Sequence, residues 1–451
     1  MNRRYKLIVT GVLLALFPWV GFAENRLGLR ECMEYAVRKS SKIQTQQADN
    51  SDAQIQRRDA ILRAFTPTVQ AGTSVYSNFG RAVDPESNTY INMTSFNNSY
   101  AINGNFTLFD GFTAINNIKI AKTAVKMGVS SEMKLRDDIC LAVMEAYFNV
   151  VFQTQMMDVL AAQVKAGEQN LKLANRQYEL GQKGYADVVQ MEADLADKQY
   201  EQVQMENRMN DALLTLKDLM LWPIEEHLEV SLDDPVVAGF EKEEQTEAEI
   251  SAFAKLNHPL ALIAKGKLES ARWELQTAKG QYLPKLSLGG GWSTNYYTYP
   301  GKSDYHATAF WDQFKNNRGA YVQVTLSFPI YDRLSRRSNL SRKKNALRRA
   351  SVAYEQTQHE IEAEVNRALQ DCEGARSAFV QAQKRSSVQE EAYRLGERKM
   401  QEGLMSPVEF QTVSNTYLKA RAEQLNSKLT YFLKQSVVNY YKGISYLDQQ
   451  L

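Results

Sequence analysis

Cysteine and histidine are the residues of this chain with the chemistry to bind a metal or act as nucleophiles. The three cysteines stand far apart, at Cys32, Cys140 and Cys372. The four histidines are equally scattered, at His227, His258, His306 and His359. Zinc sites and thiol redox motifs need two or more such residues within a few positions of each other. The spacing therefore predicts no metal site and no thiol chemistry, and it indicates that the cysteines are small core residues.

Catalysis needs several titratable groups that converge in a cleft. The sequence contains no nucleophile motif, no glycine-rich phosphate loop and no set of metal ligands. We therefore predict that the chain is not an enzyme and uses no cofactor.

The densest charge lies between Arg333 and Arg349, a stretch without any acidic residue. Its central part, which we call the basic band, consists of Arg336, Arg337, Arg342, Lys343 and Lys344. Such a run can bind nucleic acid, anionic lipid headgroups or anionic cargo, and it can equally be a solvated helix face. Export from the cytoplasm argues against nucleic acid, and the other three alternatives stay open.

The first 23 residues have the layout of a secretory signal. Basic residues precede an apolar run from Leu7 to Phe17, and the small residue Ala23 ends the segment. A membrane-spanning helix needs about 20 apolar residues, so we expect cleavage after Ala23 and no anchor. Removal of the signal leaves 51 basic against 52 acidic residues. This near-neutral balance gives no reason to expect nucleic acid as a partner.

The rest of the chain is a duplicated half-protein. At an offset of 217 residues Pro67 falls on Pro284, and at an offset of 222 residues Gly181 falls on Gly403. A period near 220 is far too long for a solenoid repeat. We predict a signal peptide at 1-23, a first repeat at 24-235 and a second repeat at 236-451.

Each repeat contains two segments in which apolar and polar residues alternate. The clearest runs from Val322 to Ile330, where every second residue is apolar. Alternation over about 9 to 11 residues is typical of a membrane-spanning β-strand, although a half-buried strand of a soluble sandwich has the same pattern. The predicted strands are 68-77, 100-109, 284-294 and 320-330.

Four strands are too few for either kind of closed structure. They cannot form a sandwich beside so much helix, and the smallest single-chain membrane barrels have about eight strands. Because lipid tolerates no unpaired strand edge, several chains must share one barrel. The polar stretches Asn78 to Asn98 and Asn295 to Gly319 are predicted to be external loops. Three aromatic residues are predicted to form a girdle at the membrane surface: Tyr76, Tyr100 and Trp292.

Very long helices follow the strands. No proline occurs from Thr113 to Leu180, and most positions in 3-4 spacing are apolar, which is a coiled-coil pattern. At 1.5 Å per residue this helix is about 100 Å long. Each long helix ends at a glycine and returns as a shorter one. We therefore predict helical hairpins at 113-221 and 338-446.

Several motifs occur twice and in the same order. Strand entries read Thr66-Pro67 and Leu283-Pro284, strand exits read Leu108-Phe109-Asp110-Gly111 and Ile330-Tyr331-Asp332, and the hairpin tips begin at Gly181 and Gly403. In this order the motifs resemble the TolC family of outer-membrane efflux ducts. The resemblance extends from about Leu27 to Tyr446.

The resemblance implies a mainly α fold with a membrane β-barrel portion. Three chains would form a twelve-stranded barrel in the outer membrane of a Gram-negative bacterium and a twelve-helix tunnel in the periplasm. The implied partners are two further copies of the chain in a homotrimer, a periplasmic membrane-fusion (adaptor) protein, an inner-membrane pump such as an RND or ABC transporter, and outer-membrane lipid. No cofactor and no nucleic acid are implied.

The hairpin tips are the family's docking surface for the adaptor. Here the corresponding residues are Gly181, Gly184, Asp187, Gly403 and Ser406. The two glycines that begin the tips, one in each repeat, are also expected to turn the chain between helices.

The periplasmic gate is matched by fewer residues. Glu409, six residues after Gly403, lies near the family's constriction, and Thr412 stands where the family's type member has a further aspartate. The acidic ring is therefore reduced. Glu409 is equally a carboxylate that stabilises a helix N-terminus.

The resulting prediction is an outer-membrane channel of a tripartite efflux system that conducts substrates passively. One alternative is the duct of a type I protein secretion system. An alternative of another class is a coiled-coil envelope scaffold or adhesin without transport, which explains the helices but not the strands.

Overall fold

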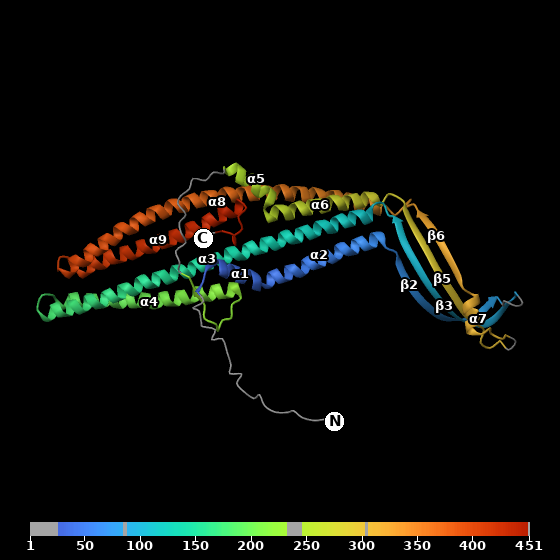
Figure 1. Ribbon diagram of the computed structural model, residues 1–451, viewed down its shortest axis with the longest axis horizontal. Helices are drawn as coiled ribbons and strands as arrows, with labels where there is room; N and C mark the ends of the chain where they lie inside the picture. The colour runs from blue at the N-terminus through green and yellow to red at the C-terminus, as the bar shows by residue number, and fades with distance from the viewer. Residues whose placement is uncertain (1–25, 84–87, 232–245, 303–304, 450–451) are drawn as a thin grey trace, which may run out of the picture.

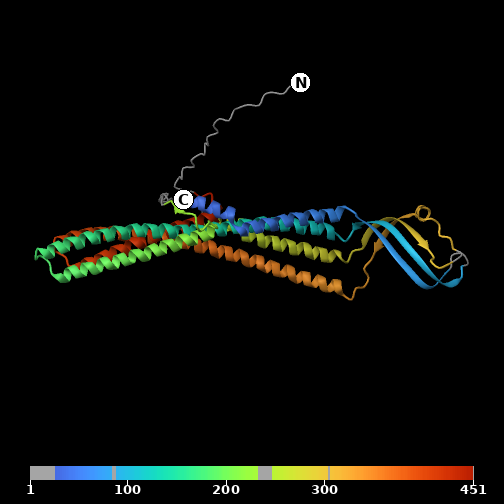
Figure 2. The same cartoon turned by 90° about the horizontal axis from the view of Figure 1, so that it is seen from below.

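The computed structural model describes residues 26–83, 88–231, 246–302 and 305–449. This part of the chain forms an elongated rod, with a β-sheet at one end and two helical turns at the other (Figure 1). The perpendicular view shows the same rod (Figure 2). The predicted signal peptide at 1-23 and the predicted boundary between residues 235 and 236 lie outside the described residues.

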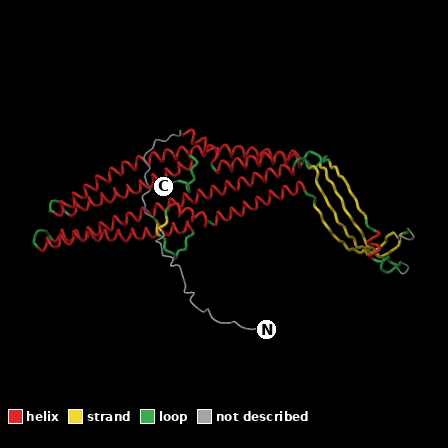
Figure 3. Tube along the Cα trace, viewed as in Figure 1, coloured by secondary structure: helices red, strands yellow, loops and turns green. Residues whose placement is uncertain are grey.

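The two halves of the chain present their long helices and sheet strands in the same order, and the second half adds a short helix between its two strands. Figure 3 distinguishes the helices from the strands by colour. The first half contains α1 (Leu29–Lys39), α2 (Ser41–Phe65), β2 (Thr68–Val83), β3 (Tyr90–Phe109), α3 (Thr113–Glu179) and α4 (Tyr185–Met220). The second contains α5 (Glu247–Asn257), α6 (Pro259–Gly280), β5 (Lys285–Thr298), α7 (Phe310–Asn316), β6 (Gly319–Ser327), α8 (Ser335–Gln401) and α9 (Pro407–Tyr441). Two short strands, β1 (Arg26–Leu27) and β4 (Glu229–Val230), pair in parallel. The predicted fold class, mainly α with duplicated long helical hairpins and four long β-strands per chain, is confirmed.

The long helices α3 and α8 have 67 residues each, which corresponds to about 100 Å. In both, an aspartate of the preceding strand exit caps the first turn of the helix. The Asp110 carboxylate accepts a hydrogen bond from the Ala114 N–H at 3.0 Å, and Asp332 accepts one from the Arg336 N–H at 3.0 Å. These bonds satisfy backbone donors that a helix N-terminus leaves without partners. With this cap α8 begins at Ser335, three residues before the predicted start.

The four long strands form one antiparallel sheet in the order β2-β3-β5-β6. Three of them are longer than predicted, and most of the stretch from Asn78 to Asn98 is strand and not loop. Its residues pair across the sheet: Asn78 lies opposite Ser95, and Arg81 lies opposite Asn92. β6 is shorter than predicted and ends at Ser327, because Pro329 has no N–H for a ladder bond.

The register gives the sheet one apolar and one polar face. Residues directly opposite each other in neighbouring strands point to the same face. On one face they include Val69, Ile102, Leu288, Trp292, Val322 and Val324. On the other they include Gln70, Ser74, Asn103, Asn105, Ser287 and Gln323. The apolar face is open to solvent in the single chain, since the Val322 residue is 81% exposed.

A hydrophobic core lies midway along the rod, where α1, α3, α4, α9 and the C-terminal segment meet. Cys32 and Cys140 are buried in it as free thiols, while Cys372 is half-buried. Burial raises the pKa of both Cys32 and Cys140 to about 12. Neither thiol is therefore in the reactive thiolate form near neutral pH. None of the described helices is long and apolar enough to cross a membrane.

Candidate functional site: the helical tips and the open sheet

The end of the rod opposite the sheet consists of two helical turns built in the same way (Figure 1). Gly181 and Gly403 follow α3 and α8 with φ of 70° and 75°. At the first turn the Gln182 N–H donates to the Gln177 carbonyl at 2.8 Å, and at the second the Leu404 N–H donates to the Lys399 carbonyl at 2.7 Å. This is the Schellman arrangement, in which a left-handed residue closes the helix. Both glycines therefore turn the chain back, as their positions in the sequence require.

The helix that leaves the second turn is capped by Ser406 and Glu409. The Ser406 N–H donates to the Glu409 carboxylate at 2.9 Å, the Ser406 hydroxyl lies 3.0 Å from it, and the Glu409 N–H donates back to that hydroxyl at 3.3 Å. This is a complete capping box. The bonds from the backbone and then the side chain of Ser406 hold the pKa of Glu409 below its usual range. Glu409 is thus an exposed, ionised group engaged at its own helix start.

Thr412 lies one turn after Glu409 and is also exposed. Its hydroxyl donates to the Val408 carbonyl at 3.1 Å. Because residues three apart share a helix face, the structure brings both predicted gate residues together on α9. The first turn differs, since Gly184 stands at the position of Ser406 and provides no side-chain cap, and Asp187 is half-buried.

The two hairpins share one apolar core at their tips. Ala174, Val188 and Met191 of the first hairpin pack with Met400 and Phe410 of the second. The partners across this contact could not be predicted from the sequence, because each helix shows only its own apolar positions.

Farther from the tips, polar groups are buried between and within the hairpins. The Ser414 hydroxyl of α9 donates to the Gln163 side-chain oxygen of α3 at 3.4 Å, and both residues are buried. Lys198 pairs with Asp194 within α4 at 2.6 Å, with little exposure of either side chain. Sequence reasoning missed these groups, because a polar residue on a helix predicts a solvated position.

The opposite end of the rod is the sheet, whose outer strands β2 and β6 each pair on one side only within the described chain. All residues of β6 are exposed. A long, flat, exposed edge strand is a template for pairing with another strand. The sheet is therefore incomplete in a single chain.

Two of the three predicted girdle residues lie on the apolar face of the sheet. Trp292 is opposite Ile102 on this face, and Tyr100 is opposite Thr73 and Thr294. Tyr76 is opposite Asn97 and shares the polar face with Gln70. Tyr76 therefore lies on the opposite face of the sheet from Tyr100 and Trp292. The sequence alone predicts this face, because Tyr76 is an even number of residues from Gln70 and alternate residues of a strand point to the same face.

The basic band lies at the start of α8, next to the sheet (Figure 1). Arg336 pairs with Asp332 at 2.8 Å, and Lys343 pairs with Glu274 of α6 at 2.7 Å. The other three residues of the band are exposed and have no ion pair within the described residues: Arg337, Arg342 and Lys344. The band is thus divided between two side chains engaged in ion pairs and three exposed side chains.

Two of three comparisons with known proteins agree with this geometry. The model of the outer membrane efflux protein family matches residues 38–220 and 253–439. No curated protein sequence matches the chain.

Solved structures share the fold at low sequence identity. The chain is similar to the outer-membrane channel CmeC of Campylobacter jejuni (16% identity, 94% of this chain and 86% of that chain covered, TM-score 0.75). It is also similar to the open state of the channel MtrE of Neisseria gonorrhoeae (18% identity, 94% and 89% covered, TM-score 0.73). A third similar structure is CusC (14% identity, 92% and 91% covered, TM-score 0.76).

The family match extends over both halves of the chain, and the sheet and the paired hairpins recur in the similar structures. The protein therefore belongs to the outer membrane efflux protein family and is a transport channel of the outer membrane, not an enzyme.

Proposed function

We propose that three copies of the chain form the outer-membrane channel of a tripartite efflux system. The observation that carries this proposal is the open four-stranded sheet with one apolar face. Lipid tolerates no unpaired strand edge, so β6 of each copy pairs with β2 of the next. Three copies then close a twelve-stranded barrel, with the apolar face toward lipid and the polar face toward the pore.

The helices continue the same closure into the periplasm. Within one chain α2, α3, α6 and α8 lie side by side below the sheet, so three copies supply twelve helices to a tunnel. Substrates pass through this channel passively. Energy and substrate choice belong to a periplasmic adaptor and an inner-membrane pump of the RND or ABC class. The family's description as an efflux protein favours this role over type I protein secretion.

The tips in this proposal dock the adaptor and gate the tunnel. The duplicated turns at Gly181 and Gly403 present exposed residues at the free end of the rod, including Leu404. Glu409 and Thr412, at the start of α9, line the constriction at the periplasmic end of the tunnel. Because the first turn lacks the serine cap of the second, the two turns present different surfaces to a partner.

The adaptor contact can be tested by photo-crosslinking in cells. A photoreactive phenylalanine at Leu404, at the tip, is expected to crosslink to a periplasmic adaptor. The same residue at Glu206, an exposed position within α4, serves as the matched control and is expected to give no such product. Equal crosslinking at both positions, or none at Leu404 in cells that contain the channel and its adaptor, would contradict docking at the tips.

A further inference from the structure

A short helix, α7, covers one end of the sheet's apolar face, far from the long helices (Figure 1). Its Phe314 ring centroid lies 5.5 Å from that of Tyr100 and 5.9 Å from that of Trp292. The ring centroid of Phe310 lies 5.4 Å from that of Tyr296. Tyr100, Trp292 and Tyr296 all belong to the apolar face. The helix is therefore seated on the face that the sheet turns toward lipid.

Polar bonds fix α7 in this place. The Thr294 hydroxyl donates to the Phe314 carbonyl at 2.7 Å, and the buried Gln313 amide exchanges two hydrogen bonds with the Tyr297 backbone at 3.0 and 2.9 Å. The Asn317 amide donates to the Asn295 carbonyl at 2.8 Å. Four consecutive positions of β5 thus hold or contact one helix, so α7 is a built part of the sheet and not a free loop.

The level of α7 matches the outer boundary of the hydrocarbon layer. A membrane strand crosses that layer in about 9–11 residues. Counted from Lys285, where β5 begins, this places the boundary near Thr294, the residue that holds α7. The helix lies on the membrane side of the sheet at the level where aromatic residues meet headgroups.

The outward side of α7 combines an aromatic ring with basic groups. Trp311 is 67% exposed, and Lys315, four residues later, shares its helix face. Arg318 follows the helix and is also exposed. Neither basic side chain has an ion pair within the described residues, and Asp312 is the single acidic residue of the helix. Trp favours the boundary between headgroups and acyl chains, and Lys and Arg bind phosphate.

We propose that α7 is a lipid anchor for phosphorylated glycolipid of the outer leaflet. Trp311 inserts between headgroups and acyl chains, and Lys315 and Arg318 bind the glycolipid phosphates. The proposal rests on the proposed membrane barrel, which makes the apolar face the lipid side. Glycolipid is the occupant because an exposed Trp and two exposed basic side chains lie at the level proposed for the outer headgroups, where a glycolipid carries its phosphates.

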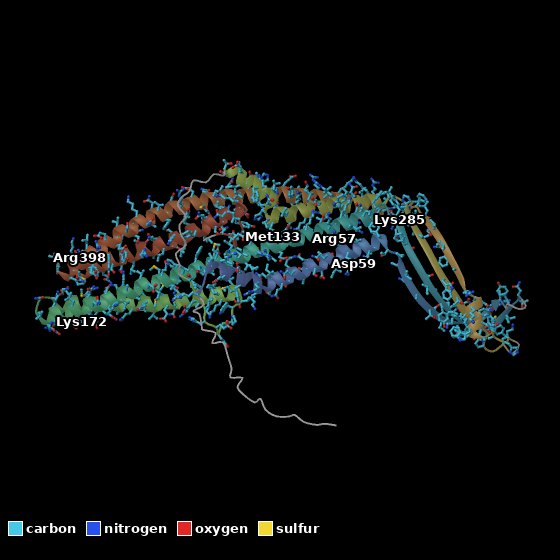
Figure 4. The ribbon with its side chains drawn as sticks, viewed as in Figure 1. Arg57, Asp59, Met133, Lys172, Lys285 and Arg398 are labelled. Atoms are coloured by element: carbon cyan, nitrogen blue, oxygen red, sulfur yellow. The ribbon has the colours of Figure 1, made fainter. Side chains whose placement is uncertain are left out.

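The phosphate contacts can be tested with bisphosphorylated lipid A as the probe. Purified full-length protein is titrated with lipid A in detergent, and bound lipid is counted by native mass spectrometry. Each basic residue near an anionic surface contributes on the order of 1 kcal/mol, so the double variant Lys315→Ser/Arg318→Ser is expected to bind about thirtyfold more weakly. The control Lys172→Ser/Arg398→Ser removes the same charges near the helical tips (Figure 4) and is expected to bind like the wild type.

The depth of Trp311 is an independent readout. In vesicles of phosphatidylcholine with lipid A, bromine on the upper part of the acyl chain is expected to quench the emission that Trp311→Phe removes. Equal lipid A binding by the two double variants, or Trp311 emission that bromine does not quench, would overturn the anchor while the trimer remains intact on an unboiled gel. Absence of the trimer itself would overturn the proposed function, and the anchor with it.

Discussion

At the residue scale, the Glu409 carboxylate combines a structural and a proposed transport role. It accepts hydrogen bonds from the Ser406 N–H and hydroxyl, and it remains exposed at the start of α9. A carboxylate near a helix N-terminus is stabilised by the helix dipole. The two alternatives drawn from the sequence, helix cap and gate residue, are therefore compatible in one side chain.

The gate role predicts an effect on ion conduction. Trimers reconstituted in a planar bilayer are expected to lose part of their block by divalent cations when Glu409 is replaced by Gln. Hydrogen bonds from Ser406 hold the pKa of Glu409 below its ordinary value of 4.5. The wild-type carboxylate is therefore ionised from pH 7 to about pH 5, and the block is expected to persist over that range. Identical single-channel traces for wild type and Glu409→Gln would exclude a gate role.

His258 supplies a second prediction, at the junction of α5 and α6. Its Nδ1 accepts a hydrogen bond from the Leu260 N–H at 3.3 Å, and its ring lies 5.7 Å from both Tyr440 and Tyr441. Burial, and then the charge of Lys134, lowers its pKa to about 4, against the opposing effect of Asp138. A lowered folded pKa means that the stabilisation is present above the ordinary value of 6.5 and is lost as pH falls from there toward 4.

Hydrogen exchange can detect this loss locally. In the wild type, exchange in the first turn of α6, corrected for intrinsic rates, is expected to rise as the pH is lowered through this range. His258→Asn keeps a side-chain acceptor for the cap and removes the titration, so its exchange is expected to stay flat. The same pH response in both proteins would show that His258 does not control this junction.

At the scale of elements, the connections between sheet and helices are as specific as the helices themselves. Gly111 in the turn between β3 and α3 has φ of 69°. A Cβ there would lie 2.0 Å from the Gly280 carbonyl oxygen at the end of α6. Gly181 has φ of 70°, with no atom within 4 Å of its Cβ position. The two glycines thus share a backbone conformation and differ in their surroundings.

The pair predicts two different outcomes for the same substitution. Gly181→Ala is expected to cost about 1–2 kcal/mol from the left-handed conformation alone, and to leave the trimer intact. Gly111→Ala adds a backbone clash at the junction with α6. The Gly111→Ala trimer is therefore expected either not to assemble or to dissociate at a lower temperature than the Gly181→Ala trimer. Trimer dissociation on heating, followed on gels, measures both. If the Gly111→Ala trimer dissociates at the same temperature as the Gly181→Ala trimer, the close approach of Gly111 to the end of α6 does not limit stability.

The elements also show what the sequence could predict. Alternation located all four sheet strands, because each alternates between an apolar and a polar face. It misplaced their ends, since the Asn, Ser and Thr residues of the polar face have the composition of a loop. It missed α7, because seven residues are too few for a helical period. The duplicated glycines Gly181 and Gly403 predicted the two hairpin turns, because each adopts the left-handed conformation that closes a helix.

At the scale of the whole molecule, one rod joins two incomplete surfaces. The sheet has open edges at one end, and the hairpins meet through a shared core at the other. Within a single chain the edge strands β2 and β6 have no second partner and the apolar face is exposed; the proposed assembly of three copies around one axis would satisfy both. Sequence alone predicted this shared barrel from the number of strands, although the contact between hairpins depends on positions that only the fold brings together.

The subunit count tests the shared barrel most directly. Native mass spectrometry of the protein extracted from outer membranes in mild detergent is expected to give the mass of three processed chains. Strand β6 of each copy is then paired, and its amides are expected to be protected from hydrogen exchange along the whole edge. A single-chain mass, with exchange along β6 as fast as in an open edge, would contradict a barrel shared by three copies.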